Sequence, residues 1–207
     1  MANECCNYIT ITGEPELIDI IATEYIGYNK KTDETYFDFN LIAPIPQDIL
    51  DNNLDYQWRI ENWGNKWDGT NAYVDLDDTQ IFISVETAWS PCDKITYKLI
   101  ELCPGVDIYH EYYEPGEGYI GYITHNAGDD PYDYEDVFYN YSHEPLKYWT
   151  MVFEKEYETF DWLSEHVEDL YDDETIIKAE ADEILLMIHE DTPLETLIAR
   201  CIDLEIL

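Results

Sequence analysis

The spacing of hydrophobic residues in the first 125 positions predicts short strands alternating with helices. Alternation of polar and apolar side chains, as in Tyr8–Thr12, is typical of a strand with one buried face. From Pro15 the apolar residues recur at helical spacing instead, so a helix is expected there. Its expected apolar face is Leu17, Ile20, Ile21 and Tyr25. Further strands are predicted over 36–41, 72–76, 80–87, 106–113 and 119–124, with a short helix over 46–50.

A second long helix is predicted between the strands expected over 80–87 and 106–113. Ser90 is suited to cap it, Pro91 to occupy its first position, and Asp93 to face the positive end of its macrodipole. Two helices packed on one face of an antiparallel sheet make the ferredoxin-like arrangement. We therefore expect an α+β protein with a ferredoxin-like domain over residues 1–125. The expected apolar face of the second helix is Ile95, Leu99 and Leu102.

From Asn126 onward the pattern becomes mainly helical and strongly acidic. Apolar residues recur at helical spacing in three segments, and the last begins with a capping box, Thr192-Pro193-Leu194-Glu195. These faces are regular enough to pack, so we expect residues 126–207 to form an ordered acidic helical region. The expected faces are Phe160, Leu163, Val167 and Leu170 in the first helix, Ile177, Ala181, Ile184, Leu185 and Ile188 in the second, and Leu197, Ile198, Ile202 and Ile206 in the third.

The charge of the chain restricts its function more than any motif does. Its 207 residues include 47 Asp and Glu against 10 Lys and Arg, a formal net charge of −37. Spread over a folded surface, this is about one net negative charge per 270 Å², within a factor of about 3 of duplex DNA. Such a field repels nucleic acid and anionic lipid and attracts basic protein surfaces. The alternative is that the charge serves only solubility or reflects a salt-adapted proteome.

Neither a membrane-spanning nor a secretory segment is indicated by the sequence. The cysteines are odd in number, and no pair has the CxxC spacing of a zinc or redox site. We therefore expect reduced, buried thiols and a cytoplasmic protein. The five cysteines are Cys5, Cys6, Cys92, Cys103 and Cys201.

Candidate catalytic and metal-binding residues are few. The histidines lack HExxH spacing, and no GxSxG, Walker A or GxGxxG pattern occurs. His110, Tyr112 and Glu114 could share one face of a strand and hold a metal, but a solvated strand face is the favoured interpretation. The segment 129–136 does not fit the glycine and glutamate positions of an EF-hand loop. We expect no enzyme activity, no cofactor and no metal.

Four tryptophans offer a second candidate site, a platform for stacking nucleic-acid bases. At this net charge, however, nothing would hold the phosphates. Packing in the core of the first domain is therefore the favoured interpretation for Trp58, Trp63, Trp67 and Trp89.

Several motifs in the first 125 residues resemble the YubB-like domain, a small ferredoxin-like family carried by bacteriophages and plasmids. They are Met1-Ala2-Asn3 with Cys5 and the strand to Gly13, then Phe39-Asn40 through Pro44-Ile45-Pro46, then Glu61-Asn62-Trp63-Gly64-Asn65-Lys66-Trp67-Asp68, then Thr87-Ala88-Trp89-Ser90-Pro91, and finally Tyr113-Glu114-Pro115-Gly116 leading to Gly121. Glu4 stands where the family usually has an aromatic residue, and the acidic helical region is not part of the domain. The resemblance implies a binding module without established chemistry. It also implies that the protein comes from a phage or plasmid, and proteins of that origin are more often inhibitors of a host defence system.

The carboxylates after residue 126 are the main functional candidates. On successive helical turns they lie about 5–6 Å apart, near the spacing of backbone phosphates, and they accept the paired hydrogen bonds that Arg donates to phosphate. We expect them to bind the groove of a basic nucleic-acid-binding protein, such as a CRISPR effector or a restriction nuclease, as a DNA or RNA mimic. The alternatives are a solvated surface on a non-catalytic accessory domain, which could form a homo-oligomer, and inhibition away from the groove. The candidate residues are Asp129, Asp130, Asp133, Glu135, Asp136, Glu165, Glu168, Asp169, Asp172, Asp173 and Glu174.

Overall fold

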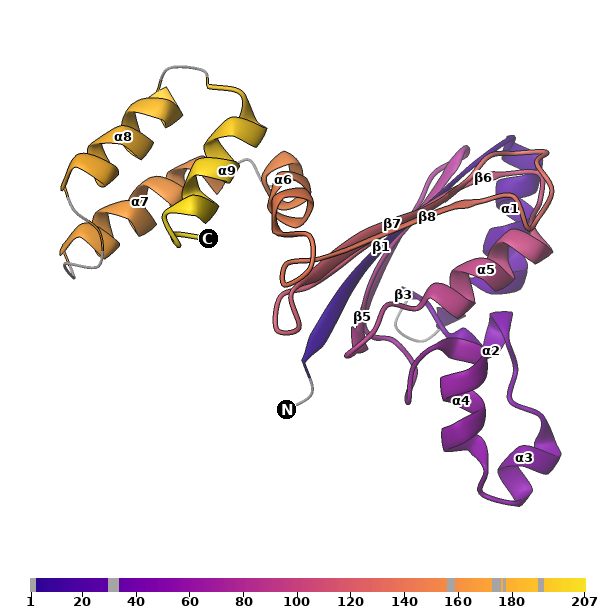
Figure 1. Ribbon diagram of the computed structural model, residues 1–207. Coiled ribbons are helices and arrows are strands. Elements are labelled where there is room, and N and C mark those ends of the chain that lie inside the picture. Colours follow the sequence, from indigo (N-terminus) through magenta and orange to yellow (C-terminus); the bar gives the residue numbers. More distant parts are fainter. Residues whose placement is uncertain (1–2, 30–33, 156–158, 173–175, 177, 190–191) are drawn as a thin grey trace. The chain divides into compact units, whose positions relative to one another are not determined.

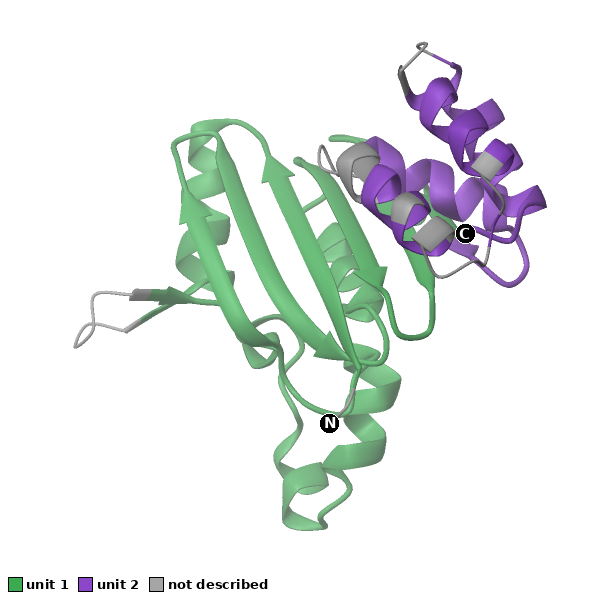
Figure 2. Cartoon of the chain, turned by 90° about the vertical axis from the view of Figure 1, so that its left-hand side faces the viewer, with its two compact units in different colours: residues 1–138 green, residues 139–207 purple. Residues whose placement is uncertain are grey.

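The computed structural model describes residues 3–29, 34–155, 159–172, 176, 178–189 and 192–207. The chain forms two compact units, residues 1–138 and residues 139–207, which are coloured separately in Figure 2. Each unit has its own hydrophobic core, so each is described by itself. The fold class is α+β. In the described part of the chain, no helix is both long enough and apolar enough to cross a membrane.

A six-stranded antiparallel sheet forms the centre of the first unit (Figure 1). Its strands are β1 (Glu4–Thr12), β4 (Thr70–Leu76), β5 (Gln80–Ala88), β6 (Asp107–Glu114), β7 (Tyr119–His125) and β8 (Glu135–Asn140). They lie in the order β4-β5-β1-β6-β7-β8, with β1 paired to β5 on one side and to β6 on the other. A small separate sheet pairs β2 (Gly27–Asn29) with β3 (Glu34–Tyr36).

Five helices are described in the first unit: α1 (Pro15–Tyr25), α2 (Phe39–Ile42), α3 (Gln47–Asp51), α4 (Asp55–Trp63) and α5 (Asp93–Leu102). Figure 1 shows α1 and α5 on the same side of the sheet. In Figure 2 the strands lie in front and these helices lie behind them. The helices of the first unit therefore leave the other face of the sheet uncovered.

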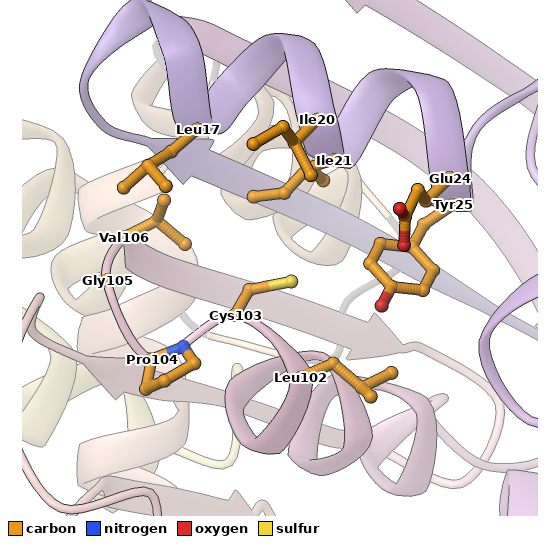
Figure 3. A pocket seen from close by; sticks show the side chains of 10 residues that line it. All are labelled: Leu17, Ile20, Ile21, Glu24, Tyr25, Leu102, Cys103, Pro104, Gly105 and Val106. Atoms are coloured by element: carbon orange, nitrogen blue, oxygen red, sulfur yellow. The ribbon is translucent and has the colours of Figure 1, made fainter.

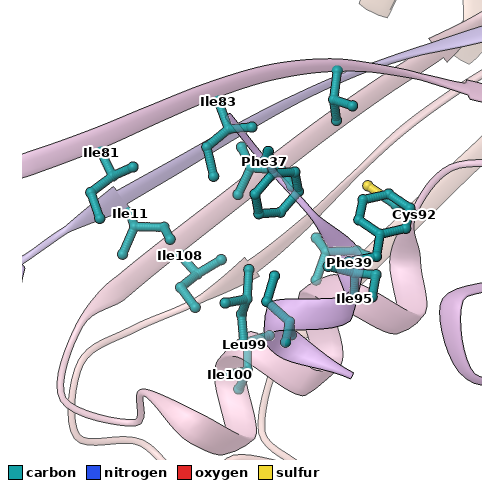
Figure 4. Packing of buried hydrophobic residues seen from close by; sticks show 14 of the residues in the cluster. Ile11, Phe37, Phe39, Ile81, Ile83, Cys92, Ile95, Leu99, Ile100 and Ile108 are labelled. Carbon is teal, nitrogen blue, oxygen red and sulfur yellow. The ribbon is translucent and has the colours of Figure 1, made fainter. Parts of the chain in front are cut away.

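The core of the first unit includes buried residues of the sheet and of both helices. Figure 4 shows the part of it in which strand residues face α5. Side chains alternate along the strands, so Ile9 and Ile11 of β1 are buried while Tyr8 is 41% exposed. Burial of each such aliphatic side chain contributes about 1.5–3 kcal/mol to folding. The layer that faces them from α5 consists of Ile95, Leu99 and Ile100.

Most strands predicted from alternation are confirmed, with ends that differ by a few residues. This holds for the predictions over 8–12, 72–76, 80–87, 106–113 and 119–124, and the hairpin between β4 and β5 is antiparallel as expected. The short helix predicted over 46–50 corresponds to α3.

The strand predicted over 36–41 is wrong, because Tyr36 ends β3 and the second half of the segment lies in α2. Asp38 caps that helix by accepting a hydrogen bond from the backbone amide of Asn40 (2.8 Å). Asp68 Oδ1 accepts another from the backbone amide of Phe39 (3.1 Å). Two aspartates, one of them distant in sequence, thus satisfy the free amides of a helix start and override the strand-like alternation.

The start of α5 also differs from the prediction. The helix begins at Asp93, with Cys92 at its N-cap and no capping bond from a side chain. The hydroxyl of Ser90 donates instead to the carbonyl oxygen of Gly64 (2.9 Å), so it joins two loops.

The expected helix faces are partly wrong as well. On α1 the residues Leu17 and Ile20 are exposed, while Ile18, which the prediction omitted, is buried. On α5 the expected Leu102 is 39% exposed, and Ile100 completes the buried face. The residue spacing identified the helices but not the rotation of each helix against the sheet.

The second unit is helical, as expected, with α6 (Pro145–Lys155), α7 (Thr159–Asp172), α8 (Lys178–His189) and α9 (Leu194–Asp203). The last three correspond to the predicted helices, and α6 was not predicted. The capping box at the start of α9 is wrong, because Pro193 takes the N-cap position without a side-chain bond. The buried core consists of Phe153, Leu163, Val167, Ile176, Ala181, Ile184, Leu197, Ile198, Cys201 and Ile206.

The two units divide after residue 138, whereas the sequence suggested a boundary after residue 125. The difference arises from β8, which extends the sheet beyond β7. The hydroxyl of Tyr112 donates to the carbonyl oxygen of Val137 (3.2 Å), and the ring of Tyr119 lies 5.3 Å from that of Phe138. The acidic segment 129–136 therefore belongs to the first unit.

Candidate acidic interface

The acidic segment 129–136 connects β7 to β8 and has a defined backbone. The amide of Asp129 donates to the carbonyl oxygen of Asn126 (3.1 Å), and the amide of Asp133 to that of Asp130 (2.7 Å). The side chain of Asp130 also accepts a bond from the amide of Tyr132 (3.0 Å). These turn bonds order the backbone of the segment, and the side chain of Asp130 takes part in them. Its exposed acids are Asp129, Asp130, Asp133, Glu135 and Asp136.

Aromatic contacts attach this segment to α5. The ring of Tyr134 stacks on that of Tyr97, with 4.9 Å between centroids. The hydroxyl of Tyr97 donates to Asp136 Oδ2 (2.5 Å), and the ring nitrogen Nδ1 of His125 donates to the carbonyl oxygen of Asp133 (3.2 Å). Burial, and then the bond to Asp136, raise the pKa of Tyr97, so its hydroxyl keeps the proton that it donates.

Paired cations would offset the charges of the exposed acids in this segment. Of the Lys and Arg side chains that the structure describes, none forms an ion pair with them. Four of the described cations pair with other acids instead. The pairs are Arg59 with Asp55, Lys98 with Glu101 (2.7 Å), Lys147 with Glu144 (2.6 Å) and Arg200 with Glu183 (2.8 Å).

The acidic candidates of the second unit lie on and after α7. Glu165 and Asp169 are exposed one turn apart, next to the buried Leu163 and Val167. The backbones of Glu168 and Asp172 lie in the same helix, and Asp173 and Glu174 fall outside the described residues. The candidates therefore fall in both units, one set in the segment 129–136 of the first unit and one set on α7 of the second.

The row His110, Tyr112 and Glu114 is buried, so the expectation of a solvated strand face is wrong. The cause is α5, which covers this side of the sheet: Thr96 Oγ1 lies 2.7 Å from His110 Nδ1. The carboxylate of Glu114 accepts hydrogen bonds from the backbone amides of Gly116 (3.2 Å) and Glu117, in the turn that follows β6. All three side chains are therefore buried inside the first unit.

The tryptophans divide into a buried and an exposed set. Trp63 is buried and packs edge-to-face against Phe39 (5.7 Å) and Trp58 (6.0 Å). Core packing is therefore right for Trp63. It is wrong for Trp67 and Trp89, which are 40% and 41% exposed and have the ammonium of Lys66 over their rings at 4.2 and 5.7 Å.

An apolar groove of about 340 Å³ lies between α1 and the end of α5 (Figure 3). Leu17, Ile20 and Val106 line it, with Tyr25 at one end. Burial raises the pKa of Cys103 to about 11 and also raises that of Tyr25, so both groups are protonated at neutral pH. The groove offers mainly apolar contact, and the carboxyl group of Glu24 lies next to Tyr25 at its end.

The cysteines follow the prediction except at one position. Cys5, Cys92, Cys103 and Cys201 are buried and reduced, whereas Cys6 is half-buried. Among the described residues, no group of three or more His, Cys, Asp or Glu side chains converges as a set of metal ligands.

A feature that the sequence interpretation missed is the open face of the sheet. Cross-strand pairing places Tyr73, Ser84, Tyr8, Glu111 and Tyr122 in one row across five strands. The neighbouring row is Asp75, Phe82, Thr10, Tyr109 and Thr124. The signal was present in the sequence, because tyrosines and acids occupy the outward positions of the same alternation that marked the strands.

Comparison with known proteins gives a likeness in fold. The solved structure of a protein api92 from Yersinia pseudotuberculosis, with the family model DUF1281, matches at a TM-score of 0.52 and 12% sequence identity. The match covers 66% of this chain and 98% of that chain. No family model matches the sequence, and no curated protein does. At this identity the likeness concerns the fold alone.

Proposed function

We propose that this chain is an acidic inhibitor, encoded by a phage or another mobile element, that occupies the basic nucleic-acid groove of a host defence protein. A CRISPR effector or a restriction nuclease has the required groove. The proposal rests mainly on one observation: the exposed carboxylates of residues 129–136 stand on a backbone held by turn bonds and are not offset by described Lys or Arg side chains. Ordered carboxylates can accept the hydrogen bonds that a groove otherwise donates to phosphates.

The fold assignment within this proposal is a ferredoxin-like domain of the YubB-like kind. The order β6-β1-β5-β4, with α1 and α5 as the two crossover helices, supports it. About two thirds of this chain matches nearly the whole of the api92 structure, a share close to that of residues 1–138. We infer that the helical second unit, which carries Glu165 and Asp169, is an addition to that domain.

Electrostatics gives the proposal a measurable signature. A complex formed by paired charges weakens steeply as salt rises, because each contact releases or displaces counterions. It also competes with the polyanion that normally fills the groove. The accessory-domain alternative, in which the charge serves only solubility, gives neither effect.

The experiment is capture from a bacterial host lysate with the immobilised full chain at about 50 mM and about 200 mM salt. Any captured protein is then purified, and its binding to labelled DNA or RNA is titrated with the chain. Recovery at low salt of a nucleic-acid-binding protein that loses its nucleic acid to the chain supports the proposal. Recovery of no such protein at either salt concentration supports the accessory domain.

A further inference from the structure

We propose that the open face of the sheet is a docking surface for an arginine-rich protein segment. The inference rests on the proposed function, because it names the chemistry of the cationic partner and the face that receives it. The surface is defined here as the two rows of outward side chains on β4, β5, β1, β6 and β7.

The first argument is charge complementarity. The five strands that carry this surface contain six Asp and Glu and no Lys or Arg, and all of these acids except Glu114 are at least partly exposed. On the open face, Glu111 lies between Tyr8 and Tyr122, and Asp75 lies beside Phe82. Burial, and then the charge of Glu86, raise the pKa of Cys6 on the same face. The field over this surface is therefore negative, which selects a cation and repels a phosphate backbone.

The second argument is the arrangement of the aromatic rings. Tyr8 and Phe82 are stacked with 6.5 Å between centroids, and Tyr109 and Tyr122 with 5.9 Å. The two pairs lie on either side of Thr10. Tyr73 and Tyr8, at 60% and 41% exposed, are the most exposed aromatic residues of the two rows. Rings and carboxylates that alternate across neighbouring strands suit an extended segment.

This combination favours arginine over lysine. A guanidinium is planar, stacks on aromatic faces and binds a carboxylate through two parallel hydrogen bonds. A lysine ammonium is a compact, strongly hydrated charge that gains less from a ring. If only net charge mattered, the two cations would bind equally.

The test measures the affinity of the full chain for fluorescent nona-arginine and nona-lysine peptides by anisotropy. We expect nona-arginine to bind about tenfold more tightly. In the variant Tyr8→Leu/Tyr109→Leu, which keeps apolar area and removes the rings, this preference is expected to fall to about twofold with nona-lysine binding unchanged. Tyr56→Leu is the matched control, since Tyr56 is 60% exposed on α4, away from the sheet. Circular dichroism checks that each variant is folded.

Backbone NMR shifts of the full chain locate the peptide. Shifts centred on Tyr8, Tyr109 and Glu111 support the docking surface. Equal binding of the two peptides, an unchanged preference in the Leu variant, or shifts confined to residues 129–136 would overturn it and leave the proposed function standing. Failure of both peptides to bind would contradict both proposals. Binding of a single-stranded oligonucleotide to the same face would replace the arginine-rich segment with nucleic-acid bases as the occupant.

Discussion

The imidazole of His110 donates a hydrogen bond from Nε2 to the side-chain oxygen of Asn7, 3.1 Å away. The direction is fixed because the amide nitrogen of Asn7 donates to the carbonyl oxygens of Cys5 (2.9 Å) and Val85 (3.1 Å), so its oxygen faces the ring. The same oxygen accepts from the backbone amide of Cys92 (3.0 Å). One asparagine thus joins β1, β5, β6 and the start of α5.

The variant His110→Gln tests whether this ring is neutral in the fold. Burial lowers the pKa of His110 from 6.5 to about 3, so between these values the unfolded chain takes up a proton that the folded chain does not. The free energy of unfolding of the wild type therefore falls as pH drops through this window. Near pH 7 we expect the free energy of unfolding of the variant to be about 1–3 kcal/mol lower than that of the wild type. Near pH 4.5 this difference should be smaller, because glutamine cannot bind the proton that His110 takes up on unfolding. Urea denaturation at both pH values measures it. An equal difference at both pH values would contradict a neutral ring.

Truncation of two neighbouring tryptophans should have very different costs. Trp63→Ala leaves a cavity in the core and removes the bond from its indole nitrogen to the carbonyl oxygen of Ala43 (2.9 Å). We expect it to lower the free energy of unfolding by about 3–5 kcal/mol. Trp67→Ala, at an exposed ring, should cost less than about 1 kcal/mol. Thermal denaturation of both variants measures the contrast, and similar costs would place Trp67 in the core.

The fragment 1–138 should fold alone, and the fragment 1–125 should be much less stable. The shorter fragment loses the stack of Tyr134 on Tyr97 and the bond from Tyr112 to Val137, and it exposes the edge of β7. Cooperative urea unfolding and proteolysis rates distinguish the two. If both fragments unfold with the same midpoint, β8 is not part of the first unit.

Removing the hydroxyl of Tyr97 should loosen the acidic segment without unfolding the domain. Tyr97→Phe deletes the bond to Asp136 and keeps the ring stack with Tyr134. We expect a loss of about 1 kcal/mol and faster amide hydrogen exchange over residues 129–136. Tyr73→Phe, on an exposed ring of β4, is the control. Unchanged exchange in the Tyr97 variant would mean that the turn bonds alone order the segment.

Alternation along the sequence predicted most strands because each has one buried face, as Ile9 and Ile11 show against Tyr8. Features that depend on distant residues could not be predicted in this way. Asp68, for example, caps α2 from nearly thirty positions away. The burial of His110 depends on Thr96 of a helix that packs over it.

The candidate acids could be predicted from composition and spacing, because exposed carboxylates need no partner within the fold. Which acids group together could not be predicted, because the sequence pattern did not reveal strand β8. This strand carries Glu135 and Asp136 and makes them part of the first unit. The tyrosines of the open face were overlooked for another reason. Tyrosine is common in strands, so its presence there gave no sign of a binding surface. Only the pairing of strands shows that Tyr8, Glu111 and Tyr122 are neighbours.

The most direct test of the central claim compares two variants that change the net charge by the same amount. One neutralises acids without an ion pair in the described structure: Asp129→Asn, Asp130→Asn, Asp133→Asn and Glu135→Gln. The other neutralises acids that pair with a neighbouring cation: Asp55→Asn, Glu101→Gln, Glu144→Gln and Glu183→Gln. The affinity of each full chain for a captured partner, or for nona-lysine, is measured over a salt series. We predict that the first variant binds at least about fivefold more weakly than the second and has a shallower dependence on salt. Equal affinities, or binding that does not respond to salt, would contradict an acidic interface at residues 129–136.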